Sequence, residues 1–325
     1  MVPLLFPGSS LMLEDMNLPR YGKVRLLPLL LLIILLALPT QALAWGVGVH
    51  LTLGANLLGR LEILPLAMQA LLAAHPLDFL YGCIAADITL GKKFTHHLEH
   101  CHNWRIGRKI LSTADTPQME ACAYGYLAHL AADTVAHCYF VPFKMVQSFN
   151  TVMLKHTYWE LRAETGTEDE VWGLVEQIAA NDYRRHDKML SSVLSDTIFS
   201  FRTNKRLFNS LLLLNRLQQW QKLINSIATT SKWEFDPTDK QEYMGLADEA
   251  IAGILGSETS PYWAADPTGD RALNAAKLIR KNLNSLWLDG KLQEREAATI
   301  LADLRRCFRR GITDPDEMLQ LQSAF

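Results

Sequence analysis

The sequence predicts an all-α protein, built as a multi-helix bundle. Strand signals are scarce, because no stretch sustains the alternation of apolar and polar residues that marks a half-buried strand, and no Asn-Gly hairpin turn occurs. Apolar residues instead recur at helical spacing in most segments after position 44. The length of that part, residues 45–325, suits one large domain or one domain with a helical extension.

The first half of this part contains five segments with helical periodicity. They are 49–61, 64–74, 119–138, 145–164 and 168–181. The second segment ends near Pro76, and the third is rich in alanine. The last segment follows Thr167, which together with Glu170 forms the pattern of a capping box.

The second half continues the pattern with helices expected at 207–227, 240–255, 271–288 and 291–310. Two loops separate them, at 229–239 around Pro237 and at 256–270, which holds Pro261, Pro267 and Gly269. The closing helical pair turns at Asp289-Gly290. The helix at 207–227 is strongly amphipathic, so its apolar face either packs on the core or contacts a membrane.

The first 44 residues are typical of a cleaved signal peptide. A basic stretch over 20–25 precedes an apolar run over 26–38, and Ala42-Leu43-Ala44 is a small-residue cleavage signal. The run is shorter than the roughly 20 apolar residues of a membrane span, although an uncleaved anchor is the alternative. A signal peptide would direct the chain to the outside of the cell or to a periplasm. Its cleavage would make Trp45 the first residue of the mature protein.

Charge and cysteine usage bear on two kinds of site. Residues 45–325 carry 29 basic and 32 acidic side chains, so bulk charge indicates no nucleic-acid footprint, while a local basic groove stays compatible with it. The five cysteines contain no C-x-x-C pair, which leaves a thiolate zinc site without support. Export permits disulfides, and the odd count leaves at least one thiol unpaired within the chain. We expect buried small side chains at these five positions, together with one or two bridges.

The alanine-rich helix carries three candidate metal ligands on one stripe. His129, Asp133 and His137 are four residues apart, and each step of four advances the helical face by only about 40°. The alanines between them keep the helix slim enough for neighbours to approach closely. A His and an Asp at this spacing also pair on ordinary helix surfaces, so the stripe alone leaves both interpretations open.

Further candidate ligands lie on either side of this helix. His156 and Glu160 repeat the spacing of four, and Asp87 sits in an apolar stretch where a carboxylate is costly to bury unless it is paired or bound to a cation. Upstream, four histidines fall within seven residues: His96, His97, His100 and His102. A solvated pair and a surface histidine cluster are the alternatives for these motifs.

The joint pattern favours zinc, which is bound by imidazole nitrogens and carboxylate oxygens. An α-amino group and its own carbonyl oxygen can also chelate a metal, so cleavage before Trp45 would add a ligand. The candidates are Trp45, His50, Asp87, a histidine near 102, His129, Asp133, His137, His156 and Glu160. Nine ligands suffice for up to three Zn²⁺ ions with open positions for water.

This ordered set resembles the zinc-dependent phospholipase C and single-strand nuclease superfamily. The resemblance runs from Trp45 to about Glu164 and implies an α-helical fold with a trinuclear zinc cluster in a cleft. We expect the first 44 residues to precede a catalytic core over 45–228. Residues 229–325 then form a C-terminal helical extension of the same domain.

The resemblance also implies how the ligands are shared among the three ions. The sets are Trp45, His50 and Asp133; Asp87, His102, His129 and the bridging Asp133; and His137, His156 and Glu160. Within the histidine run we choose His102, because Asn103-Trp104 after it resembles the family's polar-aromatic context, and His100 is the alternative.

The chain departs from the family pattern at several points. Asp133 and His137 are four residues apart, where the best-known members have six, so His137 stays on the continuous helix. The short spacing from Trp45 to His50 is like the nuclease branch, whereas Glu160 is like the phospholipase branch. Ile88 replaces the Tyr of choline-selective members. The helical C-terminal half gives no sign of the β-sandwich of toxin-type members.

Three functions follow from these features. The first is a zinc-dependent phospholipase C that releases diacylglycerol from phospholipid at a membrane surface, with Asp87 as ligand and general base and with no protein partner implied. The alternative is a single-strand nuclease or nucleotidase, whose bases would stack on aromatic residues near the ligands: Tyr139, Phe140, Phe143, Tyr158 and Trp159. The third is a helical protein with a closed structural zinc site.

Overall fold

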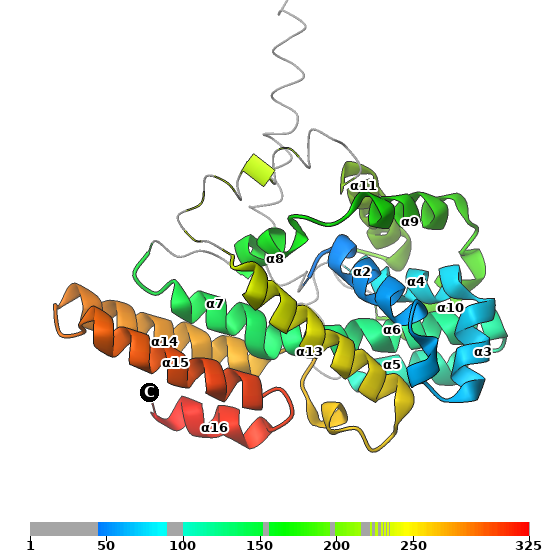
Figure 1. Ribbon diagram of the computed structural model, residues 1–325. Helices are drawn as coiled ribbons and strands as arrows, with labels where there is room; N and C mark the ends of the chain where they lie inside the picture. Colours follow the sequence, from blue (N-terminus) through cyan, green and yellow to red (C-terminus); the bar gives the residue numbers. More distant parts are fainter. Residues whose placement is uncertain are drawn as a thin grey trace, which may run out of the picture. The chain divides into compact units, whose positions relative to one another are not determined.

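Helices make up the regular structure of the protein (Figure 1). The computed structural model describes residues 45–89, 100–151, 156–195, 199–215, 222, 225, 226, 229, 231, 233 and 235–324. No strand occurs in these residues, which confirms the predicted all-α class. The expected signal peptide, residues 1–44, lies outside them, as do His96 and His97.

Helices occur along the whole of the described part of the chain. The α-helices are α2 (Val47–Leu58), α3 (Leu66–Ala74), α4 (Pro76–Ala85), α5 (Trp104–Thr113), α6 (Pro117–Val135), α7 (Val141–Gln147), α8 (His156–Glu164), α9 (Asp169–Ala180), α10 (Arg184–Val193), α11 (Phe201–Asn215), α13 (Pro237–Gly256), α14 (Asp270–Leu288), α15 (Glu294–Arg310) and α16 (Pro315–Ala324). Short 3-10 turns lie at η1 (Leu61–Ile63), η2 (Ala86–Ile88) and η6 (Pro261–Ala264), and η5 (Ala136–Phe140) is a π-helical turn.

Helix α6 is the centre of the packing, and its sequence explains why. Thr116 caps its first turn by accepting a hydrogen bond from the Met119 amide at 3.3 Å, and Pro117 occupies the first helical position. Nearly every later side chain of α6 is buried, because α4, α5 and α13 pack around it. A helix that is covered on all sides is apolar all round, which the alanine-rich sequence satisfies.

Helices α4 and α6 cross at a pair of glycines. A Cβ atom on Gly82 would lie 2.0 Å from the Cys122 carbonyl oxygen, and one on Gly125 would lie 2.0 Å from the Phe79 carbonyl oxygen. Only glycine allows two backbones to approach this closely. The crossing places the end of α4, and with it Asp87 in η2, beside α6.

The predicted helix over 145–164 is wrong, because two helices occupy it. Helix α7 ends at Gln147, and Ser148 adopts a non-helical backbone conformation. The Ser148 hydroxyl donates to the Lys144 carbonyl at 2.9 Å, and the Thr151 hydroxyl donates to the Ser148 carbonyl at 2.8 Å. Such local side-chain bonds satisfy the carbonyls that a continuing helix would use.

The predicted capping box at Thr167 is also wrong. Helix α9 begins where expected, but its N-cap residue is Glu168, whose side chain makes no capping bond. The Thr167 hydroxyl instead donates backwards to the Glu164 carbonyl at 2.8 Å. A capping box does occur at the start of α15, between Gln293 and Glu296.

Several other boundaries differ from the sequence expectations. Helix α13 begins at Pro237, inside the expected loop, because the Asp236 carboxylate accepts from the Thr238 amide at 2.8 Å. Helix α11 starts six residues before the expected 207–227 segment, and residues 216–221 of that segment lie outside the described part. Helices α4, α5, α10 and α16 lie outside the segments predicted to be helical.

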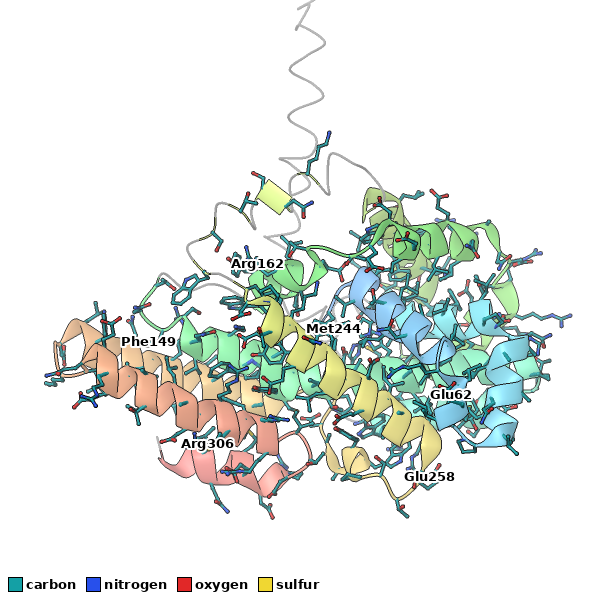
Figure 2. The ribbon with its side chains drawn as sticks, viewed as in Figure 1. Glu62, Phe149, Arg162, Met244, Glu258 and Arg306 are labelled. Carbon is teal, nitrogen blue, oxygen red and sulfur yellow. The ribbon has the colours of Figure 1, made fainter. Side chains whose placement is uncertain are left out.

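The C-terminal helices pack on the core through a buried charged network. The Lys144 ammonium is buried and lies 2.6 Å from the Asp239 carboxylate, which also accepts from Arg305 at 2.7 Å. Farther along, the Phe149 ring, labelled in Figure 2, lies 5.7 Å from the Trp287 ring. All the described residues belong to one compact unit.

Among the described residues, no single helix is long and apolar enough to cross a membrane. Only α3 taken together with α4 and η2 would be, by length and composition, and that pair is bent by 92°.

Candidate metal centre

Two residues of α6 form the base of a buried polar cluster. His129 and Asp133 lie one turn apart on the helix, and both are almost completely buried. The His129 Nε2 atom lies 3.2 Å from Asp133 Oδ2. The predicted stripe on this helix therefore faces the interior and not solvent, which removes the alternative of an ordinary surface pair.

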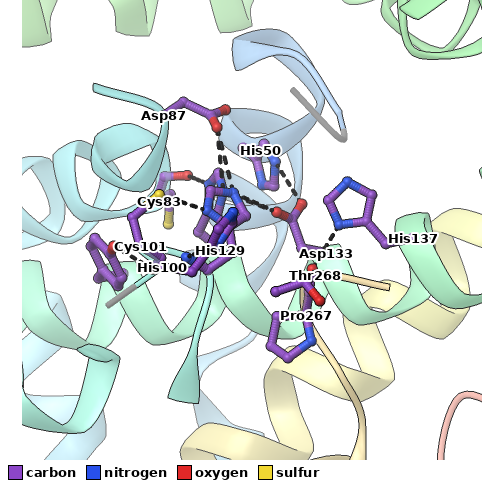
Figure 3. A network of polar contacts seen from close by, with 12 residues as sticks. His50, Cys83, Asp87, His100, Cys101, His129, Asp133, His137, Pro267 and Thr268 are labelled. Atoms are coloured by element: carbon purple, nitrogen blue, oxygen red, sulfur yellow. Dashed lines mark hydrogen bonds and ion pairs between the residues drawn. The ribbon is translucent and has the colours of Figure 1, made fainter. Parts of the chain in front are cut away.

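Three other segments bring donors to this base (Figure 3). The two oxygens of Asp133 face different partners: His50 Nε2 from α2 lies 3.3 Å from Oδ1, and His102 Nε2 lies 2.9 Å from Oδ2. His102 Nε2 also lies 3.1 Å from His129 Nε2. Asp87 Oδ1, from the end of α4, lies 3.5 Å from His102 Nε2 and 3.9 Å from His129 Nε2.

These separations fit metal coordination. Four ligand atoms around a tetrahedral Zn²⁺ at roughly 2.0–2.1 Å lie about 3.3 Å from one another. The His50 Nε2 atom and both Asp133 oxygens are buried and have no hydrogen-bond partner. Buried polar atoms are costly without a partner, so this donor set matches a cation that satisfies all of them at once.

A second contact fixes which nitrogen of His129 faces the cluster. His129 Nδ1 lies 2.8 Å from the Cys83 carbonyl oxygen. Because a carbonyl only accepts, Nδ1 carries a proton, and in the neutral imidazole that a metal requires Nε2 keeps the lone pair. A lone pair that faces the Asp133 carboxylate at 3.2 Å is repulsive unless a cation or proton lies between them. Metal-bound histidines are oriented by outer hydrogen bonds of this kind.

Burial and neighbouring charges together determine the pKa values of His50 and Asp133 when no metal is bound. Desolvation, helped by the nearby His129, lowers the pKa of His50 to about 4, so its imidazole is neutral at pH 7 and able to bind a metal. Burial by itself raises the pKa of Asp133. The positive charge of a protonated His129 and the close approach of the His102, His129 and His50 imidazoles outweigh burial and hold that pKa well below its usual range.

The structure distinguishes between the two described histidines of the upstream run. His102 reaches the cluster through Nε2, whereas His100 accepts a hydrogen bond from the His102 backbone amide at 3.1 Å. His100, Cys101 and His102 also bring ligand atoms within 4.8 Å of one another. The sequence analysis missed this group, because it looked for thiolate sites only as C-x-x-C pairs.

The remaining predicted ligands lie around the cluster. The Trp45 ring is buried 6.4 Å from the His50 ring, and the His137 ring lies 6.3 Å from the His102 ring. Glu160 is buried on α8, and His156 begins the same helix, although its side chain is outside the described part. The arrangement of the third predicted site, like its cleft, stays a prediction.

One supporting residue was not anticipated. The Glu164 carboxylate, from α8, accepts from the Gly48 amide at 3.1 Å and from the Val49 amide at 3.0 Å. It therefore caps α2, which has no side-chain cap of its own. A Cβ atom on Gly46 would lie 2.5 Å from the Glu164 carboxyl carbon, so glycine gives this carboxylate room. The glycines at 46 and 48 were the available signal.

The family model for zinc-dependent phospholipase C matches residues 49–211. The chain belongs to the zinc-dependent phospholipase C family. This membership, together with the buried His and Asp groups, supports zinc as the metal and places the chain among hydrolases. The match contains every predicted ligand except Trp45 and ends well before the C-terminal helices. Neither the curated proteins nor the solved structures gave a match.

None of the five cysteines, all of which are described residues, forms a disulfide. Cys83, Cys101, Cys122 and Cys138 are buried, and Cys307 is half-buried. Burial raises the pKa of the Cys122 thiol well above its usual range, which keeps it protonated and unreactive at neutral pH. The expectation of small buried side chains holds for four of the five, whereas the expected one or two bridges are absent among these five described cysteines.

Proposed function

We propose that the protein is a phospholipase C that hydrolyses phospholipids to diacylglycerol and a phosphorylated head group. The observation that carries the proposal is Asp133, whose two oxygens face separate donor groups 3.3 and 2.9 Å away. A carboxylate in this position can bridge two metal ions. Glu160 favours the phospholipase branch, because a Glu at this position is typical of it.

The side chains of the buried cluster would have different roles in the proposed reaction. His50 would hold one zinc ion with Asp133, and His102, His129 and Asp87 would hold its neighbour. Zinc bound there would lower the pKa of a bound water and stabilise negative charge on a phosphoryl oxygen. Asp87 lies at the edge of the cluster, 3.5 Å from His102 Nε2, and is the residue placed to take a proton from the attacking water.

We propose a third ion, held by His137, His156 and Glu160, on the strength of the family resemblance. Up to three ions would then be bound. The His137 ring lies 6.3 Å from the His102 ring, and Glu160 is buried on α8.

The substrate is proposed to be reached at a membrane surface, and α11 supports this. Its inward face is core-forming, since Phe208 and Leu212 are buried. Its outward side exposes Leu207 and Leu213 to 40% and 57%, and the helix contains basic but no acidic residues. Apolar side chains among basic ones suit the surface of an anionic bilayer. The core-facing interpretation holds for the inner face of this helix, and we propose the membrane-contacting interpretation for its outer face.

A vesicle assay tests the proposed reaction. Purified protein beginning at Trp45 is incubated with mixed phospholipid vesicles, with and without a zinc chelator, and diacylglycerol is measured by mass spectrometry. We expect release that the chelator abolishes and that Asp133→Asn reduces by at least 100-fold. Asp303→Asn, at a side chain 59% exposed, serves as the control and should retain activity. Full activity of Asp133→Asn would overturn the assignment.

The nuclease alternative keeps one observation in its favour, the short spacing between Trp45 and His50. The structure weakens it elsewhere, because the aromatic residues expected to stack on bases are mostly core residues. Tyr139, Phe140, Phe143 and Trp159 are buried, and only Tyr158 is partly exposed. Zinc-loaded protein that releases no diacylglycerol but cleaves single-stranded DNA would establish this alternative.

Export and cleavage before Trp45 complete the proposal. The buried Trp45 ring packs against His50 and Phe140, so the residue belongs to the folded protein and not to a removable leader. N-terminal sequencing of the exported protein should give Trp-Gly-Val-Gly. A different first residue would remove the amino group from the proposed zinc site.

A further inference from the structure

A turn from the C-terminal region, residues 265–270, contacts the metal centre at His137. The His137 Nδ1 atom lies 2.6 Å from the Pro267 carbonyl oxygen, as Figure 3 shows. We propose that this turn is a positioning element of the metal centre, which fixes the His137 ring as a ligand. The inference rests on the proposed role of His137 in holding zinc.

The contact sets both the tautomer and the direction of the ring. Because the Pro267 carbonyl can only accept, His137 Nδ1 carries the proton and Nε2 keeps the lone pair that a metal needs. The same arrangement holds His129, whose Nδ1 donates to the Cys83 carbonyl at 2.8 Å. His137 lies in the π-helical turn η5, whose wider winding changes the direction of its side chain relative to the α-helical stripe.

The turn is held on two sides by residues near the candidate ligands. The Trp104 indole nitrogen, two residues after His102, donates to the Ala265 carbonyl at 2.8 Å. The Cys138 thiol, next to His137, donates to the Asp266 carbonyl at 3.3 Å. The turn therefore links the segment of His102 to the helix of His137.

The turn is also rigid in itself and shaped to fit His137. The Asp266 carboxylate accepts from the Thr268 amide at 2.9 Å and from its hydroxyl at 2.7 Å. Gly269 has a φ angle of +62°, and a Cβ atom there would lie 2.3 Å from His137 Cβ. A cavity of about 270 Å³ is lined by residues of the turn, so a displaced turn has space to move into.

Zinc binding in two glycine variants tests the inference. Gly269→Ala pushes the turn away from His137, whereas Gly290→Ala puts alanine at a φ angle of +70° with nothing within 4 Å and serves as the matched control. Asp266→Ala loosens the turn without a clash. Zinc per chain is counted by mass spectrometry, affinity is measured by competition with a chromophoric chelator, and the cobalt-substituted proteins are compared by visible absorption.

We expect Gly269→Ala and Asp266→Ala to weaken one zinc site by 10- to 100-fold and to change its cobalt spectrum, as the loss of an orienting contact does. Gly290→Ala should bind zinc like the wild type. If Gly269→Ala does not fold, Asp266→Ala decides the question. Wild-type affinity and spectrum in the folded turn variant would overturn the inference. Since the readout is metal binding, a wild type that binds zinc but releases no diacylglycerol counts against the proposed function alone.

Discussion

Replacing Gly125 by alanine should push apart the two helices that bring Asp87 to the cluster. The new Cβ atom would lie 2.0 Å from the Phe79 carbonyl oxygen, against about 3.4 Å for ordinary contact. Relief of the clash needs a separation of about 1.4 Å between α4 and α6. The obstacle is backbone, so no side-chain rotation can remove it.

The expected cost follows from two opposing effects. Alanine in place of glycine inside a helix stabilises by about 1 kcal/mol through the entropy of the unfolded chain. Overpacking of a tight interior costs about 1–3 kcal/mol and more where backbone must move. We expect Gly125→Ala to lower the free energy of unfolding by about 2 kcal/mol or more, because the clash dominates. Gly245→Ala, on the exposed side of α13 with open space around it, should raise it by about 1 kcal/mol.

Urea unfolding followed by far-UV circular dichroism measures both variants, with and without zinc. The wild type should gain stability from zinc, and Gly125→Ala should lose most of that gain, because Asp87 is carried away from His102 and His129. Equal stability of Gly125→Ala and Gly245→Ala would refute the reasoning about the crossing.

Three further outcomes are expected. The pKa of His50 is about 4 in the folded protein and 6.5 in the unfolded chain, so between these pH values the unfolded chain binds one more proton. The free energy of unfolding of the zinc-free protein should therefore fall by about 3 kcal/mol as the pH falls from 6.5 to 4. Urea unfolding measures this, and a free energy of unfolding that does not change with pH would contradict it. Lys144→Met should destabilise by about 2–3 kcal/mol, with a double-mutant cycle against Asp239→Asn showing coupling above 1 kcal/mol. Glu164→Ala should cost about 1–2 kcal/mol in thermal unfolding, whereas Glu168→Ala, whose side chain caps nothing, should change it by less than about 0.5 kcal/mol.

The sequence was informative where function constrains local spacing. The stripe of His129 and Asp133 was visible because the period of a helix is fixed. The cost of burying Asp87 marked it out within an apolar stretch. The order of the ligands along the chain in the family then pointed to His50 and His102. The structure brings these two histidines together with Asp87, His129 and Asp133. The length of α6 was also close to expectation, since its alanines match a helix covered on every side.

Long-range contacts explain what the sequence did not reveal. The break after Gln147 is accompanied by hydroxyl bonds from Ser148 and Thr151 to carbonyls of the preceding turn. Periodicity alone could not distinguish this from a continuing helix. The cap supplied by Glu164 comes from more than a hundred residues away, and the Pro267 carbonyl lies 130 residues from His137. No local pattern records such pairs.

The carboxylate of Glu164 has a consequence for how the chain folds. Its bond to the Gly48 amide closes a loop of 116 residues, so the first turn of α2 gains its cap only after α8 has been synthesised and docked. Until then α2, which carries His50, is a short helix with unsatisfied amides in its first turn, and it frays readily. Opening of α8 in the finished protein should likewise release α2. The Gly48 and Val49 amides should therefore exchange hydrogen at the same rate as the amides of α8. Helices α2 and α8 would then open as one cooperative unit.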